Sequence, residues 1–219
     1  DAVPQQELTL LKRSPQIAFE RNKQIHAVTA DALPLFLPSP MQVKKTEGAF
    51  LLNHTTAISF DAVFANEATL LQTDLAVVLG KQPAFAKQQT NSITFKQISG
   101  LPAEGYRLLI TASEIRIEAS AAAGAFYAVQ SLKQLFPSEA WTVSRKEVQL
   151  TTADITDAPR FAYRSFMLDV ARNFQAKQQV LKIIDLLALY KINTLHFHLT
   201  DDEGWRLQIP TLSELTNVG

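Results

Sequence analysis

The sequence predicts an α+β domain, with an antiparallel sheet and helices on one face, followed by the first β-α-β unit of a larger β/α domain. Up to about residue 157, strand-like and helix-like segments mix without strict alternation, which favours an α+β fold. After that point, two short strands flank one amphipathic helix, and this arrangement requires a parallel sheet or a barrel. Because a lone parallel pair buries almost nothing, we expect further strands to cover it.

The composition is that of a globular protein and argues against several classes of function. The 219 residues leave room for one domain and part of another, and 47% of them are hydrophobic. Lys and Arg number 21, as do Asp and Glu, so no basic surface for nucleic acid is expected. We find no uncharged apolar run of about 18 residues and expect no membrane span. The chain has no cysteine, which excludes disulfides, thiol catalysis and Cys-based zinc sites.

Residues 1–37 are weakly patterned, because Pro4, Pro15 and Pro34 interrupt any long element. We predict a strand or two there, or a linker. Residues 33–40 contain three prolines and should form an extended lead-in, since each proline biases the residue before it away from helix.

The α+β pattern occupies residues 48–152. Apolar residues at helical spacing predict a helix over residues 64–79 that ends at Gly80. A second helix is predicted between Ser120, which we assign as its N-cap, and Pro137. Strands, the last two joined as a hairpin, are predicted at residues 57–60, 93–95, 106–110 and 115–118.

The pattern changes after residues 157–160 (DAPR). From there the chain is predicted to form a strand, a helix and a strand, at residues 166–170, 175–190 and 194–199. Asp154 and Asp157, just before this change, are interpreted as turn and cap residues.

Polar side chains gather at the C-terminal ends of these two strands, where α/β barrels keep their active sites. His196 and His198 alternate with a Leu-Phe-Leu row, so in a barrel the histidines would point inward. Asp201 and Asp202 follow at the end of the same strand. These four residues are therefore candidates for a functional site.

Asp169 lies inside the first of these strands, and Arg172 lies just past its end on the same side of the sheet. A guanidinium group beside carboxylates suits hydroxyl-rich or anionic ligands, because it supplies fixed bidentate donors. Three interpretations of the cluster stay open: a sugar-binding hydrolase site, a metal site built on the His-x-His pair, and hydrogen-bonded barrel filling beside solvated carboxylates. Trp205 either stacks on a sugar face or serves as a packing anchor.

Three motifs here closely resemble the opening of the catalytic barrel of glycoside hydrolase family 20, whose bacterial chitobiases are β-N-acetylhexosaminidases. The motifs are MLDVARNF at 167–174, YKIN at 190–193 and HFHLTDDEGWR at 196–206. The preceding region is similar to the non-catalytic α+β domain of that family at PSP (38–40), GAF (48–50), GYRL (105–108) and GAFYAVQ (124–130).

The resemblance implies three parts. Residues 1–37 would connect to an upstream domain, residues 38–157 would be the non-catalytic α+β domain, and residues 158–219 would begin a truncated (β/α)8 TIM barrel. The rest of the barrel is expected in the full-length protein. The implied location is the periplasm or the outside of the cell.

The resemblance also implies a reaction. Such enzymes remove terminal N-acetylhexosamine from chitooligosaccharides or glycans with retention of configuration, and the acetamido oxygen of the substrate is the nucleophile. An Asp-Glu pair after the fourth barrel strand orients this group and protonates the leaving oxygen. Because that pair is not in this chain, we expect the fragment itself to be inactive.

Two positions carry a family role directly. Arg172 matches the arginine that grips the C3 and C4 hydroxyls of the terminal sugar, and Asp201 matches the aspartate that supports the acid/base Glu through a histidine further along. Asp202 and Trp205 are expected to line the substrate site. No metal or cofactor is implied. The alternatives from other classes are a metal-dependent amidohydrolase-like barrel and a non-catalytic carbohydrate-binding or scaffold protein.

Overall fold

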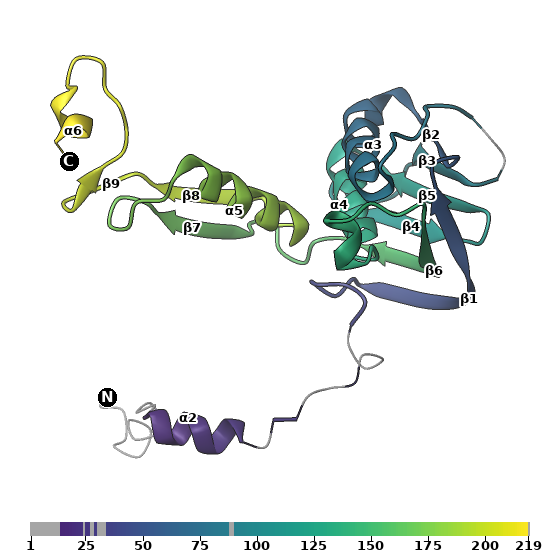
Figure 1. The fold of residues 1–219 in the computed structure, drawn as a ribbon, viewed down its shortest axis with the longest axis horizontal. Coiled ribbons are helices and arrows are strands. Elements are labelled where there is room, and N and C mark those ends of the chain that lie inside the picture. Colours follow the sequence, from purple (N-terminus) through teal and green to yellow (C-terminus); the bar gives the residue numbers. More distant parts are fainter. Residues whose placement is uncertain (1–13, 24, 27–28, 30–33, 88–89, 219) are drawn as a thin grey trace. The chain divides into compact units, whose positions relative to one another are not determined.

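The computed structural model describes residues 14–23, 25–26, 29, 34–87 and 90–218, and Figure 1 shows their elements. The chain divides into two units, Asp1–Pro34 and Leu35–Gly219, which are described separately.

The first unit contains the helix α2 (Pro15–Asn22). The Ser14 hydroxyl caps it by accepting a hydrogen bond from the N–H of Ile17 at 3.2 Å. Pro15 stands in the first turn, where its fixed φ suits a helix and its missing N–H costs nothing. The prediction of a strand is therefore wrong over α2, because Pro15 begins an element that we expected it to interrupt.

The second unit begins with a six-stranded sheet in the order β1-β6-β4-β5-β3-β2. Its strands are β1 (Gln42–Asn53), β2 (Ala57–Phe60), β3 (Ser92–Gln97), β4 (Tyr106–Ile110), β5 (Glu114–Ala119) and β6 (Glu147–Asp157). Strands β1, β6, β4 and β5 pair antiparallel, whereas β5, β3 and β2 pair parallel. The predicted antiparallel sheet is thus wrong at β2 and β3. A helix joins these two strands, and such a crossover returns the chain in the same direction.

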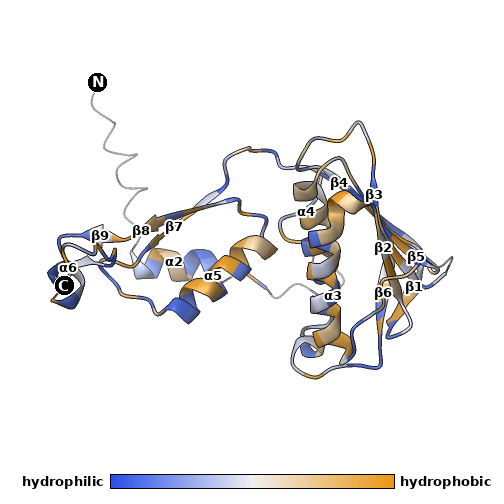
Figure 2. Ribbon diagram, turned by 90° about the horizontal axis from the view of Figure 1, so that it is seen from above, coloured by the Kyte–Doolittle hydropathy of each residue, from blue (hydrophilic) through white to orange (hydrophobic). Residues whose placement is uncertain are grey.

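Helices α3 (Ala65–Leu79) and α4 (Ala122–Lys133) cover one face of this sheet, as Figure 2 shows. The predicted end of α3 is confirmed, because Gly80 follows it in the left-handed conformation, with φ 68°. The predicted N-cap of α4 is wrong. The cap residue is Ala121, and the Ser120 hydroxyl instead donates a hydrogen bond to the Pro102 carbonyl at 3.0 Å. Two short 3-10 helices, η2 (Ala62–Phe64) and η3 (Ser138–Trp141), flank these elements.

The sheet and the two helices enclose the hydrophobic core. Residues alternate between buried and half-buried along β4 and β5, as expected of strands with one face on a core. A Cβ atom at Gly124 would overlap the carbonyl oxygen of Gly105, so α4 can pack this closely only with a glycine there. The largest fully buried core side chains include Phe50, Leu52, Ile58, Phe64, Leu71, Leu75, Ile93, Phe95 and Tyr106.

One helical stretch of the described residues, Ala62–Leu79, is long and apolar enough to cross a membrane by length and composition alone. It contains Glu67 and Asp74, and Phe64, Leu71 and Leu75 on it are fully buried in the core. A helix that packs on the sheet of its own domain meets the same criteria.

The predicted β-α-β unit follows, as β7 (Ser165–Asp169), α5 (Lys177–Leu189) and β8 (Thr194–His198). The two strands pair in parallel, with Asp169 opposite His198. They leave apolar surface bare, because Phe166, Met167 and Phe197 are 44%, 50% and 37% exposed. The short strands β9 (Thr200–Asp201) and β10 (Gly204–Trp205) form a hairpin, and helix α6 (Glu214–Asn217) comes after it.

A buried ion pair ties this unit to the sheet. Lys191 follows α5 with φ 60°, a left-handed position where glycine is usual, and its ammonium group lies 2.8 Å from the Asp157 carboxylate. The same group donates a hydrogen bond to the Tyr106 hydroxyl at 2.9 Å. Asp154 pairs with Arg107 at 2.7 Å. The prediction of turn and cap roles is therefore wrong for Asp154 and Asp157, since both lie in β6 and pair with a cation.

Candidate active site

The loop after β7 is held by the last residue of that strand. The Asp169 Oδ1 atom accepts hydrogen bonds from the N–H groups of Ala171 and Arg172, both at 3.1 Å. The Asp169 Oδ2 atom lies 2.6 Å from Nε of Arg172. One carboxylate thus fixes both the backbone of the loop and the base of the guanidinium group.

Arg172 bridges the ends of two neighbouring strands. Its Nε atom also lies 3.4 Å from Oδ2 of Asp201, and its side chain is 50% exposed. The charges of Asp169 and then Asp201 raise the pKa of Arg172. Conversely, the hydrogen bond from the Arg172 N–H is the largest of the causes that lower the pKa of Asp169. Arg172 is therefore a cation that two carboxylates hold at Nε, with half of its side chain exposed.

Asp201 reaches this cluster from β9. His198 Nε2 lies 2.9 Å from Oδ2 of Asp201, and the N–H of Asp202 donates to Oδ1 at 2.9 Å. The Asp202 N–H, then the Asp202 side chain, His198 and the charge of Arg172, lower the pKa of Asp201 to about 2. Asp201 is therefore an anion at neutral pH and accepts hydrogen bonds. It cannot serve as a proton donor there.

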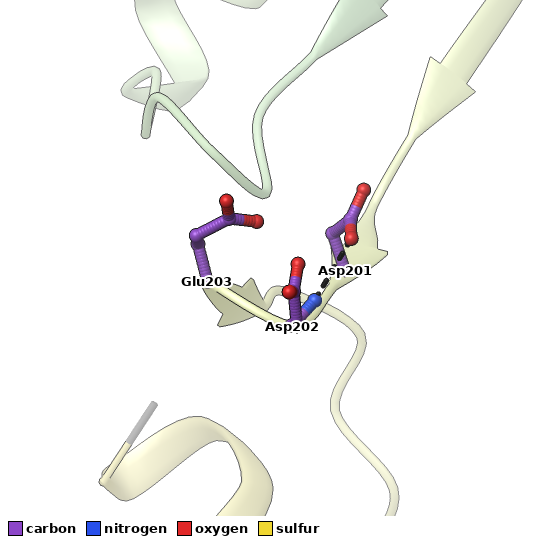
Figure 3. A group of neighbouring side chains, drawn as sticks. All are labelled: Asp201, Asp202 and Glu203. Carbon is purple, nitrogen blue, oxygen red and sulfur yellow. Dashed lines mark hydrogen bonds between the residues drawn. The ribbon is translucent and has the colours of Figure 1, made fainter.

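Asp202 and Glu203 make the turn between β9 and β10, and Figure 3 shows them beside Asp201. Carboxylate oxygens of the three residues lie within 4.8 Å of one another. The hydrogen bond with Asp202 raises the pKa of Glu203. In the part of the chain that the structure describes, neither His196 nor His198 joins such a group.

Trp205 and Arg206 complete the hairpin. The indole N–H of Trp205, a half-buried residue, donates to the Leu207 carbonyl at 2.6 Å. Arg206, to which the sequence alone assigned no role, donates to the carbonyls of Val170 and Ala171 in the loop that bears Arg172.

Of the residues to which the family resemblance gives a site role, the structure gathers Arg172 and Asp201 into one charged cluster. Asp202 contributes its N–H to that cluster, and Trp205 lies on the adjoining strand. The alternation along β8 could have identified His198 as the partner of Asp201. No sequence pattern indicates the hydrogen bonds of Arg206, because their acceptors are backbone carbonyls.

Two family models match the chain. The model described as glycosyl hydrolase family 20, domain 2, matches residues 34–158. The model of the glycosyl hydrolase family 20 catalytic domain matches residues 161–219. The six-stranded sheet with its helices thus corresponds to the accessory domain of the family, and the β-α-β unit to the start of its catalytic domain.

Curated relatives agree with this assignment. The chain is 40% identical to N,N'-diacetylchitobiase from Vibrio harveyi over 203 residues, which is 92% of this chain and 22% of that protein. It is 37% identical to a β-hexosaminidase from Vibrio vulnificus over 202 residues, which is 92% of this chain and 23% of that protein. The chain thus spans less than a quarter of the length of each of these two relatives.

Solved structures are similar as well. The family 20 exo-β-N-acetylglucosaminidase from Vibrio harveyi, solved with N-acetylglucosamine, matches with a TM-score of 0.76 and 32% identity over 84% of this chain and 28% of that one. The family 20 β-N-acetylhexosaminidase from Streptomyces coelicolor A3(2) matches with a TM-score of 0.73 and 34% identity over 84% of this chain and 39% of that one. On its motifs, its two domain matches and these structural neighbours, the chain belongs to glycoside hydrolase family 20.

Proposed function

We propose that this chain is part of a retaining exo-β-N-acetylhexosaminidase that hydrolyses terminal N-acetylhexosamine from chitooligosaccharides or glycans. In this proposal residues 1–37 connect to an upstream domain, 38–157 form the accessory domain, and 158–219 begin a (β/α)8 barrel. The reaction is substrate-assisted, with the acetamido oxygen of the sugar as the nucleophile. The periplasm or the outside of the cell is the proposed location.

The observation that carries the proposal is the environment of Arg172. Both of its ion pairs in the described residues, to Asp169 and Asp201, use Nε. Half of the side chain is exposed, and neither of these two ion pairs uses its terminal nitrogens. A guanidinium held at its base by carboxylates is pre-organised to donate several hydrogen bonds at once. The C3 and C4 hydroxyls of a terminal sugar are the proposed acceptors.

Asp201 is proposed to support the reaction without touching the sugar. Its lowered pKa keeps it anionic, so it can hold an imidazole in one tautomer and orientation. Its present partner is His198. The histidine that relays this support to the acid/base Glu is proposed to lie further along the longer protein. Asp202 and Trp205 are proposed to line the substrate site from the hairpin.

The exposed apolar side chains on β7 and β8 support the proposal of a barrel. Phe166 and Phe197 are exposed on β7 and β8, although parallel strands are normally covered on both faces. Further strands on either side, with helices outside them, would bury these side chains. The C-terminal ends of the strands would then form the face on which barrel enzymes bind their substrates.

Two proteins test this proposal: the chain of residues 1–219 and the longer protein that contains it. The longer protein should release p-nitrophenol from p-nitrophenyl N-acetyl-β-glucosaminide, and proton NMR should detect the β-anomer of the sugar first. The chain alone should release none, because the general acid is absent. Release of p-nitrophenol by the chain alone would contradict the proposal that the fragment is inactive. Binding without release by the longer protein would favour a carbohydrate-binding function, and loss of activity on metal chelation would favour a metal-dependent hydrolase.

A further inference from the structure

Arg206 binds the backbone of the loop that presents Arg172. Its Nε atom donates to the carbonyl oxygen of Val170 at 3.0 Å, and its Nη2 atom donates to that of Ala171 at 2.9 Å. Val170 is 3% exposed and Ala171 is fully buried. Two charge-assisted hydrogen bonds from one planar group fix the orientation of this backbone as well as its position.

The same guanidinium group also contacts the loop beyond Arg172. The Cζ atom of Arg206 lies 5.4 Å from the ring centroid of Phe174, within the range of a cation–π contact. Arg206 therefore holds the loop on both sides of Arg172, at Val170 and Ala171 before it and at Phe174 after it.

The hairpin brings Arg206 to this place. The backbone N–H of Arg206 donates to the carbonyl of Leu199, the residue after β8, at 2.9 Å. At Gly204 an added Cβ atom would lie 2.6 Å from the carbonyl oxygen of Ala171 and 2.5 Å from Nη2 of Arg206. Only a residue without a side chain allows the hairpin to approach the loop so closely.

We propose that Arg206 is a positioning residue, which fixes the loop from Val170 to Phe174 and so aims the Arg172 guanidinium at the terminal sugar. This inference rests on the proposed function of Arg172. Asp169 holds the base of the Arg172 side chain, whereas Arg206 holds the backbone from which that side chain extends. Arg206 itself uses its donors on the loop and needs no contact with the sugar.

A double-mutant cycle in the longer protein tests the proposal through kcat/KM for p-nitrophenyl N-acetyl-β-glucosaminide. Arg206→Ala should lower kcat/KM by roughly 10- to 100-fold, because two charge-assisted hydrogen bonds are lost. The double variant Arg172→Ala with Arg206→Ala should be no slower than Arg172→Ala alone, since a misplaced side chain cannot matter once it is absent. If the two losses multiply in the double variant, Arg206 acts independently of Arg172 and the proposal is overturned.

Two further variants keep the test valid if Arg206→Ala does not fold. Arg206→Lys retains the charge but cannot bond both carbonyls in one plane, so it should recover only part of the loss. Gly204→Ala keeps the Arg206 side chain in the sequence, but its added Cβ would overlap both Nη2 of Arg206 and the Ala171 carbonyl oxygen. The variant should therefore break the contact of Arg206 with the loop and lower kcat/KM in the same way. Normal kinetics in both variants would contradict the proposal. Arg145→Ala, an exposed arginine of the accessory domain, is the matched control and should match the wild type.

A failure of the hydrolase proposal can be distinguished from a failure of the Arg206 proposal. If the wild type releases no p-nitrophenol, the hydrolase proposal fails, whereas hydrogen exchange of the amides at residues 170–174 still reports on Arg206. Those amides should exchange faster in Arg206→Ala than in Arg145→Ala. Equal exchange in the two variants would overturn the role of Arg206 whatever the enzyme activity.

Discussion

The Asp201 carboxylate and the Arg172 guanidinium group meet at 3.4 Å across the ends of two parallel strands. Arg172 lies three residues past the end of β7, and Asp201 lies three residues past the end of β8, so the parallel pairing of these strands brings the two charges together. The parallel register thereby places two motifs that are separate in the sequence, one with Arg172 and one with Asp201, in the same cluster. A shift of either strand by one residue would move its side chains to the opposite face of the sheet and dissolve the pair.

Asp201 should titrate far below an ordinary aspartate. Its pKa is lowered from 3.8 to about 2, with the Asp202 N–H as the largest cause. Because the folded pKa is the lower one, ionised Asp201 stabilises the folded state above pH 3.8, and this contribution is lost as the pH falls toward 2. Carboxyl-carbon NMR titration of the chain should give a midpoint near pH 2. Arg172→Ala should raise it, and a wild-type midpoint at or above 3.8 would contradict the described geometry.

The Lys191–Asp157 pair should stabilise the chain through its burial. The side chains are 7% and 12% exposed, so Lys191→Met would leave a carboxylate without its cation inside the protein. We expect the free energy of unfolding to fall by about 3–5 kcal/mol. Urea denaturation followed by tryptophan fluorescence measures this change. Lys182→Met on exposed α5 is the control, and an equal effect of the two variants would refute the prediction.

Gly124 should not tolerate a methyl group. Gly124→Ala adds a Cβ atom that would overlap the Gly105 carbonyl oxygen, so α4 must move from the sheet. Overpacking of this kind costs about 1–3 kcal/mol, although alanine is the better helix former. Thermal denaturation of the chain should show a lower Tm for Gly124→Ala. A Tm at or above that of the wild type would contradict the close packing.

Elements with a strong local signal were predicted well from the sequence. Strands β2 and β4 occur at the predicted residues, and Gly80 ends α3 because only glycine adopts its left-handed conformation without strain. The β-α-β unit is confirmed within one or two residues at each end. These features depend on periodicity and on single residues with special backbone preferences.

The remaining features depend on contacts between distant residues. Pro15 starts a helix because Ser14 caps it, and the sheet is mixed because α3 forms a crossover. Asp157 is a pairing residue because Lys191 approaches it from another element. In the site, the proximity of Arg172 and Asp201 was predictable from their positions near the ends of paired strands, whereas their roles stay predictions. The hydrogen bonds of Arg206 were not predictable, since no residue pattern reveals a bond to a backbone carbonyl.

Arg172 is the residue on which the whole account depends, and its replacement is the most direct measurement. In the longer protein, Arg172→Ala should lower the turnover of p-nitrophenyl N-acetyl-β-glucosaminide by several orders of magnitude, because the hydrogen bonds that hold the terminal sugar in the transition state are lost. Circular dichroism should find the variant folded like the wild type. Near-normal kcat and KM for the folded variant would contradict the assignment of Arg172 to the sugar site.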